Sequence, residues 1–215
     1  MFIEALALGL IAGIVRGGRV RNLLELEIAG VSLILTAVVL QILPIVLEPF
    51  IKSENWLSFL PFAGILVMVA AIIMNRKKKG FYIILIGAIL NILAMAVSDF
   101  RMPATEAALL RAGMQSMLET IQDGSVINYI LVTSGDGLGY YLGKVIALPE
   151  IYPLSNLFSV GDLFISAGLA YFIQNSMLTQ WFRKSGSMIN YRFSVVLEKA
   201  AECRQSFLIV EFMPV

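Results

Sequence analysis

This chain alternates long apolar runs with short charged or turn-forming segments, which leaves few folds open to it. The five runs cover about residues 2–15, 28–47, 57–74, 81–97 and 158–176. A helix that crosses a bilayer needs about 20 mainly apolar residues, with a range of about 17–25. Hydrophobic residues make up 59% of the chain and charged residues 14%, whereas a soluble domain has about 45–50% and about 25%. We therefore predict an all-α fold, an integral membrane bundle of about five transmembrane helices over residues 1–182.

Basic residues follow the first, third and fifth runs, and this pattern predicts the orientation of the bundle. Cytoplasmic loops carry an excess of Lys and Arg. The residues concerned are Arg16, Arg19, Arg21, Arg76, Lys77, Lys78, Lys79, Arg183 and Lys184. We therefore expect a multi-pass protein with its N-terminus outside and its C-terminus in the cytoplasm.

Two segments are too polar or too irregular to span. Residues 101–156 are expected to form an external cap, in which Pro103 opens a helical pattern that Asp123-Gly124 closes. Apolar residues recur in that pattern at three- and four-residue spacing, which predicts an amphipathic helix; they are Leu110, Met114, Met117, Leu118 and Ile121. Residues 183–215 are expected to form a short cytoplasmic tail.

The residue types that the chain lacks exclude several kinds of chemistry. It has no histidine and one cysteine, Cys203. These counts exclude Ser-His and Cys-His nucleophile pairs, histidine-liganded metal sites and an internal disulfide. The net charge of +1 gives no overall basicity that would favour nucleic acid. We therefore predict no metal site, no cofactor and no nucleic-acid partner.

Ionisable residues at the ends of apolar runs are candidates for function, because charge is costly inside or near a bilayer. Asp162 lies near the start of the fifth run, where Ser159-x-x-Asp162 also has the spacing of a helix capping box. Asp99 and Arg101 follow the fourth run, which contains Asn91 as a mid-run amide. Asn91 is expected to donate an interhelical hydrogen bond, with a ligand contact as the alternative.

Asp99 and Asp162 are predicted at a similar depth, because the fourth and fifth helices would run in opposite directions. Two carboxylates within about 5–6 Å can share a proton and activate water for peptide hydrolysis. The segments Val97-Ser-Asp-Phe100 and Phe158-Ser-Val-Gly-Asp162 resemble the dyad motifs of lipoprotein signal peptidases, with Ser159 in place of the motif's asparagine. An aspartyl peptidase-like enzyme that uses Asp99 and Asp162 is therefore one hypothesis.

A second resemblance covers most of the chain. Four segments resemble, in order, the signature positions of a family of bacterial membrane proteins, domain-of-unknown-function family 5317. They are Gly17-Gly18-Arg19, Met102-Pro103, Leu142-Gly143-Lys144 to Pro149, and Phe158 to Asp162. This resemblance implies one polytopic domain in the bacterial plasma membrane, and it implies no activity.

The leading functional prediction is a binding or scaffold protein of unknown biochemical activity. We expect it to use a polar external rim made of Asp99, Arg101, Ser159 and Asp162, with Asn91 beneath the rim. Membrane lipids are the expected partners, together with a protein or a peptide. The peptidase hypothesis is the alternative.

Overall fold

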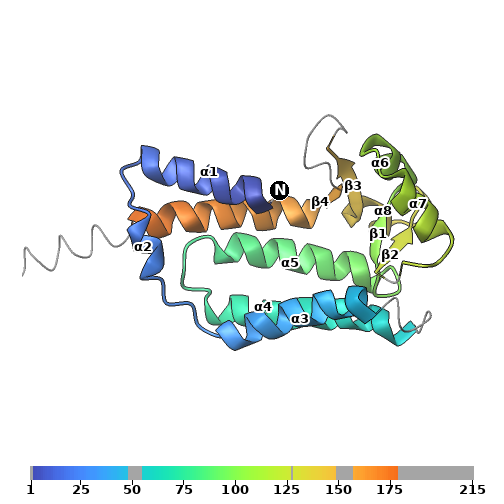
Figure 1. The fold of residues 1–215 in the computed structure, drawn as a ribbon, viewed down its shortest axis with the longest axis horizontal. Helices are drawn as coiled ribbons and strands as arrows, with labels where there is room; N and C mark the ends of the chain where they lie inside the picture. The colour runs from blue at the N-terminus through green and yellow to red at the C-terminus, as the bar shows by residue number, and fades with distance from the viewer. Residues whose placement is uncertain (1, 48–54, 127, 149–156, 179–215) are drawn as a thin grey trace, which may run out of the picture.

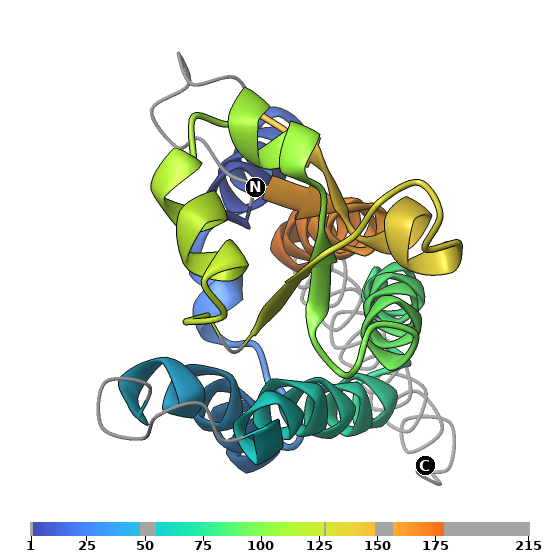
Figure 2. The same cartoon turned by 90° about the vertical axis from the view of Figure 1, so that its right-hand side faces the viewer.

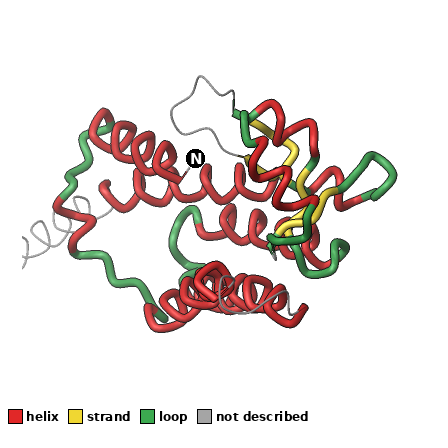
Figure 3. Tube along the Cα trace, turned by 45° about the vertical axis from the view of Figure 1, so that its right-hand side comes forward, coloured by secondary structure: helices red, strands yellow, loops and turns green. Residues whose placement is uncertain are grey.

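The computed structural model describes residues 2–47, 55–126, 128–148 and 157–178. Long helices lie side by side along the long axis of the molecule, and a small sheet with several short helices occupies one end (Figure 1, Figure 3). The predicted cytoplasmic tail, residues 183–215, and part of the predicted cap, residues 149–156, lie outside the described residues.

The long helices coincide with the five apolar runs. They are α1 (Phe2–Val15), α3 (Val31–Leu47), α4 (Phe59–Met74), α5 (Phe81–Ala96) and a last helix described over 160–178. The short helix α2 (Arg21–Leu24) connects α1 to α3, and the 3-10 helix η1 (Asn55–Ser58) leads into α4. The runs therefore predicted the positions of these helices to within about three residues.

The predicted transmembrane bundle is nevertheless wrong. Helices α1, α3, α4 and α5 have 14, 17, 16 and 16 residues. At about 1.5 Å per residue these helices are about 21–26 Å long, against about 30 Å of bilayer hydrocarbon. The 160–178 helix is longer, but it contains Asp162, Gln174 and Asn175. None of the helices in the described parts of the chain combines the length and the apolar composition of a membrane span.

The all-α assignment is also wrong, because the fold contains a four-stranded mixed sheet. Its strands are β1 (Met102–Ala104), β2 (Tyr129–Leu131), β3 (Lys144–Ala147) and β4 (Leu157–Ser159), in the order β2-β1-β3-β4. β1 pairs in parallel with β2 and β3, and β3 pairs antiparallel with β4.

Proline is tolerated in the middle of β1 because the neighbouring residues make the bonds to β2. The Met102 N–H donates to the Asn128 carbonyl at 2.9 Å, and the Val132 N–H donates to the Ala104 carbonyl at 3.0 Å. Pro103 has no N–H to donate, and these two hydrogen bonds do not require one. The sequence pattern predicted a helix that starts at Pro103, whereas the next helix, α6 (Glu106–Arg111), begins three residues later.

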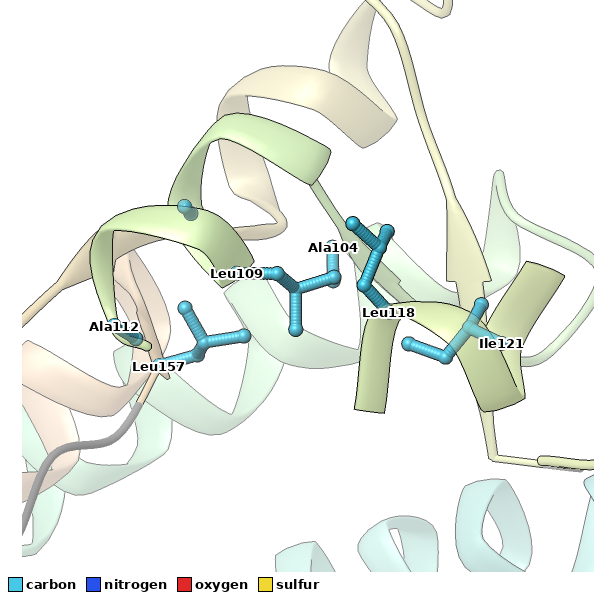
Figure 4. Packing of buried hydrophobic residues seen from close by; sticks show 7 residues of the cluster. Ala104, Leu109, Ala112, Leu118, Ile121 and Leu157 are labelled. Atoms are coloured by element: carbon cyan, nitrogen blue, oxygen red, sulfur yellow. The ribbon is translucent and has the colours of Figure 1, made fainter. Parts of the chain in front are cut away.

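The predicted amphipathic helix of the cap is two short helices. They are α6 (Glu106–Arg111) and α7 (Gln115–Gln122), separated by a turn in which Gly113 has a φ of +70°. A third short helix, α8 (Leu138–Leu142), precedes β3. α6, α7 and the strands enclose a small core of their own, with Leu109 and Leu157 near its centre (Figure 4). The cap is therefore a packed α/β subdomain with its own hydrophobic core.

Glycines allow the last helix to approach its neighbours closely. A Cβ added at Gly87 would lie 2.5 Å from the Gly161 carbonyl oxygen, and one at Gly80 would lie 2.6 Å from the Gly168 carbonyl oxygen. A Cβ at Gly9 would lie 2.8 Å from the Ala170 carbonyl oxygen. The 160–178 helix thus lies against α5 on one side and α1 on the other, while α3 pairs with α4, which also contacts α5 (Figure 2).

The outward faces of the long helices are apolar, and one end of the molecule is basic. Exposed large hydrophobic residues on α1 and α3 include Ile3, Leu8, Ile11, Ile14, Leu35, Val39, Ile42 and Val46. Arg16, Arg19 and Arg21 lie at the end opposite the sheet, where α1 ends (Figure 1). The turn that holds Lys77, Lys78 and Lys79 is at the same end, because the Lys78 ammonium donates to the Glu27 carbonyl.

Candidate functional site

The first turn of the 160–178 helix carries the capping box that the sequence predicted. The Asp162 N–H donates to Ser159 Oγ at 3.0 Å, and the Ser159 N–H donates to Asp162 Oδ2 at 3.1 Å. Both donors would otherwise lack a partner within the helix. The carboxylate also lies at a helix N-terminus, where the helix dipole favours negative charge.

Asn91 connects this capping box to α5. Its Nδ2 donates to Asp162 Oδ1 at 3.0 Å, and its Oδ1 accepts from Ser159 Oγ at 2.7 Å. Asn91 is 7% exposed and Ser159 is fully buried, so a broken bond here would leave polar atoms without water. The prediction that Asn91 donates an interhelical hydrogen bond is therefore confirmed.

Asp99 lies outside this network, and Arg101 is half-buried two residues farther along the chain. Asp99 is exposed and follows the end of α5, about two helical turns beyond Asn91. Asp99 and Phe100 have φ angles of 49° and 60°, and the Phe100 ring packs on Phe59 and Phe62 with centroids at 4.5 and 4.9 Å. Among the described residues, no hydrogen bond joins Asp99 to Asp162. Of the five predicted site residues, the structure therefore brings together Asn91, Ser159 and Asp162.

A cavity of about 590 Å³ opens beside this network. Its wall comes from α3, α4, α5, the sheet and the 160–178 helix, and both Asn91 and Asp162 line it. The lining residues of α5 run from Phe81 to Met95, which corresponds to about 21 Å along the helix axis. The cavity is therefore long as well as large enough for a small molecule.

One end of the cavity is apolar and the other is polar. The end farthest from the sheet is lined by Ile34, Ile72, Phe81 and Leu169. The end at the sheet is lined by Asn128, Tyr129 and Lys144, next to the network of Asn91 and Asp162. Such a surface matches a molecule that has a long apolar body and a polar group at one end.

Sequence reasoning missed the polar residues of the sheet. Lys144 belongs to β3 and pairs with Ser159 of β4, so the two side chains leave the same face of the sheet with Cβ atoms roughly 4.5–5.5 Å apart. The Lys144 ammonium donates to the Tyr129 hydroxyl at 3.2 Å. The only signal in the sequence was that Lys144 interrupts an otherwise apolar stretch before Pro149.

The described residues hold no group of three or more acidic or cysteine side chains placed to bind a metal ion. The chemistry that the site offers is hydrogen bonding and charge at one end of an apolar cavity. This arrangement suits binding and orientation of a ligand.

The sequence profile of DUF5317, a family of unknown function, matches residues 25–174. The chain belongs to this family. A comparison with curated proteins and a comparison with solved structures each gave no match. The part that matches DUF5317 begins after α2 and contains all the residues that line the cavity, from Ile34 to Leu169. The candidate site is thus formed within the DUF5317 region, whereas α1 precedes that region.

Proposed function

We propose that this protein binds an amphipathic small molecule, with the apolar body of the ligand in the cavity and its polar group at the sheet. The observation that carries this proposal is the division of one cavity into an apolar end and a polar end.

The dimensions of the cavity support a chain-like ligand. The cavity is about 21 Å long. The acyl chains of one leaflet fill roughly 15 Å, which is half of a hydrocarbon layer about 30 Å thick, so the cavity is longer than such a chain. Its volume of about 590 Å³ lies within the range of about 300–1,000 Å³ for small-molecule sites. A single alkyl chain with a small head group meets both limits.

We do not propose the aspartyl peptidase. A proton-sharing dyad requires two carboxylates within hydrogen-bonding reach of each other. Asp162 bonds instead to Asn91 and Ser159, and Asp99 is exposed beyond the end of α5.

The proposal is tested with a series of straight-chain carboxylates from hexanoate to dodecanoate, each titrated calorimetrically into the purified full chain below its micelle concentration. Each methylene that enters the apolar end should contribute about 0.8 kcal/mol, so the affinity should rise about fourfold per methylene. The rise should continue through dodecanoate, because an extended twelve-carbon chain is shorter than the cavity's length of about 21 Å. Affinities that do not depend on chain length, or no binding by any member, would overturn the proposal.

We also propose that the protein contacts membrane lipid through the apolar faces of its long helices. Large exposed apolar area marks an interaction site, and exposed large hydrophobic residues occur on α1, α3, α4 and α5. Basic residues at the end opposite the sheet are suited to anionic head groups, each contributing about 1 kcal/mol near such a surface.

Vesicle flotation tests this contact, with vesicles of phosphatidylcholine alone or mixed with phosphatidylglycerol. The protein should float with both and bind the mixed vesicles more tightly. The double variant Lys77→Glu, Lys79→Glu should lose most of that preference, at about fivefold per charge removed. Arg111→Glu, which changes an exposed arginine at the sheet end, is the matched control. Protein that stays at the bottom with both vesicles, or an equal loss in the control, would contradict the proposal.

A further inference from the structure

We infer that the ligand's polar group is an anion, such as a carboxylate or a phosphate, and that Lys144 binds it. This inference rests on the proposed function and specifies the class of ligand. It assigns a binding role to a residue of β3 that no predicted site contained.

Among the described residues, Lys144 is a half-buried cation without an acidic partner. Its ammonium donates to the neutral hydroxyl of Tyr129 at 3.2 Å and lies 5.3 Å from the centre of that ring. Within the described parts of the chain, it forms no ion pair with any carboxylate. Removing part of a charge from water has a cost that a partner of opposite charge offsets, and an ammonium has three donors, of which Tyr129 accepts one. An anionic group that enters the polar end of the cavity would supply the missing partner.

Asp162 is the carboxylate that lines the same cavity, and its oxygens already have partners. Oδ1 accepts from Asn91 and Oδ2 accepts from the Ser159 N–H. The helix N-terminus stabilises its charge further. The protein itself therefore stabilises the charge of Asp162, whereas the charge of Lys144 is available to a ligand.

Asn128 adds a second requirement at the polar end. Its Oδ1 is buried and has no hydrogen-bond partner among the described residues, although the residue lines the cavity. A buried acceptor of this kind needs a donor. A neutral hydroxyl head group could donate to Asn128 Oδ1 and accept from Lys144, whereas a carboxylate has no donor for Asn128 but would form a charge-assisted hydrogen bond with Lys144. We expect the charge-assisted bond to decide the order of affinities, so that the anion binds most tightly, the hydroxyl less tightly and a cation least tightly.

Three probes with the same chain separate these possibilities: dodecanoate, dodecanol and dodecylammonium. With the wild-type protein we expect dodecanoate to bind about tenfold more tightly than dodecanol, as one charge-assisted hydrogen bond would give. Dodecylammonium should bind most weakly. If it binds most tightly, Asp162 contacts the head group and the inference is overturned.

The matched variants are Lys144→Met and Lys77→Met. Lys144→Met keeps an unbranched apolar side chain, so dodecanoate affinity should fall about tenfold while dodecanol affinity changes less than about twofold. Lys77 is exposed at the opposite end of the molecule, and its substitution should change neither affinity. Equal affinities for the three probes, with Lys144→Met binding as wild type does, would refute the role of Lys144 and leave the proposed function intact. If none of the three probes binds, the proposed function itself fails.

Discussion

Gly161→Val is expected to destabilise the protein by about 3 kcal/mol or more. A Cβ at position 161 would lie 2.6 Å from the Gly87 carbonyl oxygen and would collide with Asn91 Oδ1. Overpacking of this kind costs about 1–3 kcal/mol. Displacement of Asn91 would also leave Ser159 or Asp162 without a partner, at about 1–3 kcal/mol. Denaturant unfolding, followed by circular dichroism, measures the loss.

Two further variants show whether the loss of stability comes from the close helix contact at Gly161. Gly161→Ala should also destabilise the protein, although alanine is favoured over glycine inside a helix by about 1 kcal/mol. Gly135→Val is the control, because a Cβ there has its nearest neighbour at 3.8 Å and should change stability by less than about 0.5 kcal/mol. A Gly161→Val protein as stable as the Gly135→Val protein would show that the close approach of α5 and the 160–178 helix does not hold the fold together.

Local patterns predicted the helices and their ends. The apolar runs located the five long helices because the length of a run and its bounding charges are properties of adjacent residues. The Ser159 to Asp162 spacing predicted the capping box for the same reason. Gly9 and Gly13 are four residues apart, and both face the 160–178 helix.

The sheet could not be predicted because its strands are three or four residues long. Such segments are too short to show the alternation that identifies a strand. β1 also contains Pro103, which predicted the start of a helix. β3 lies in the segment predicted as an external cap, and residues 158–159 of β4 lie in the fifth run, which was predicted as a transmembrane helix. The position of Lys144 beside Ser159 depends on the pairing of β3 with β4. Without the sheet, the polar end of the cavity could therefore not be predicted.

The prediction of transmembrane helices failed at the step from apolar composition to helix length. Apolar content was correctly read as helix, but the observed helices are short, and the longest one contains polar residues at both ends. Asp99 and Asp162 were expected to meet because both were placed near one edge of the bundle. The structure instead pairs Asp162 with Asn91, about two turns from Asp99 along α5.

Ile65→Trp is expected to remove most of the dodecanoate binding. Ile65 is half-buried and lines the cavity, so a tryptophan ring at this position would occupy the space of the ligand's chain. A ring that excludes about four methylenes costs about 3 kcal/mol of binding free energy, which is on the order of a 100-fold loss of affinity. The adjacent residue Leu66 is 46% exposed, which makes Leu66→Trp a control with the same change in chemistry.

Calorimetric titration of dodecanoate into these two variants tests most directly whether the ligand occupies this cavity. Both variants should first unfold at denaturant concentrations close to that of the wild-type protein, so that a loss of binding reports on the cavity. We predict an affinity on the order of 100-fold below wild type for Ile65→Trp and within about twofold of wild type for Leu66→Trp. Equal and undiminished binding by both variants would contradict the account, because the ligand would then lie elsewhere.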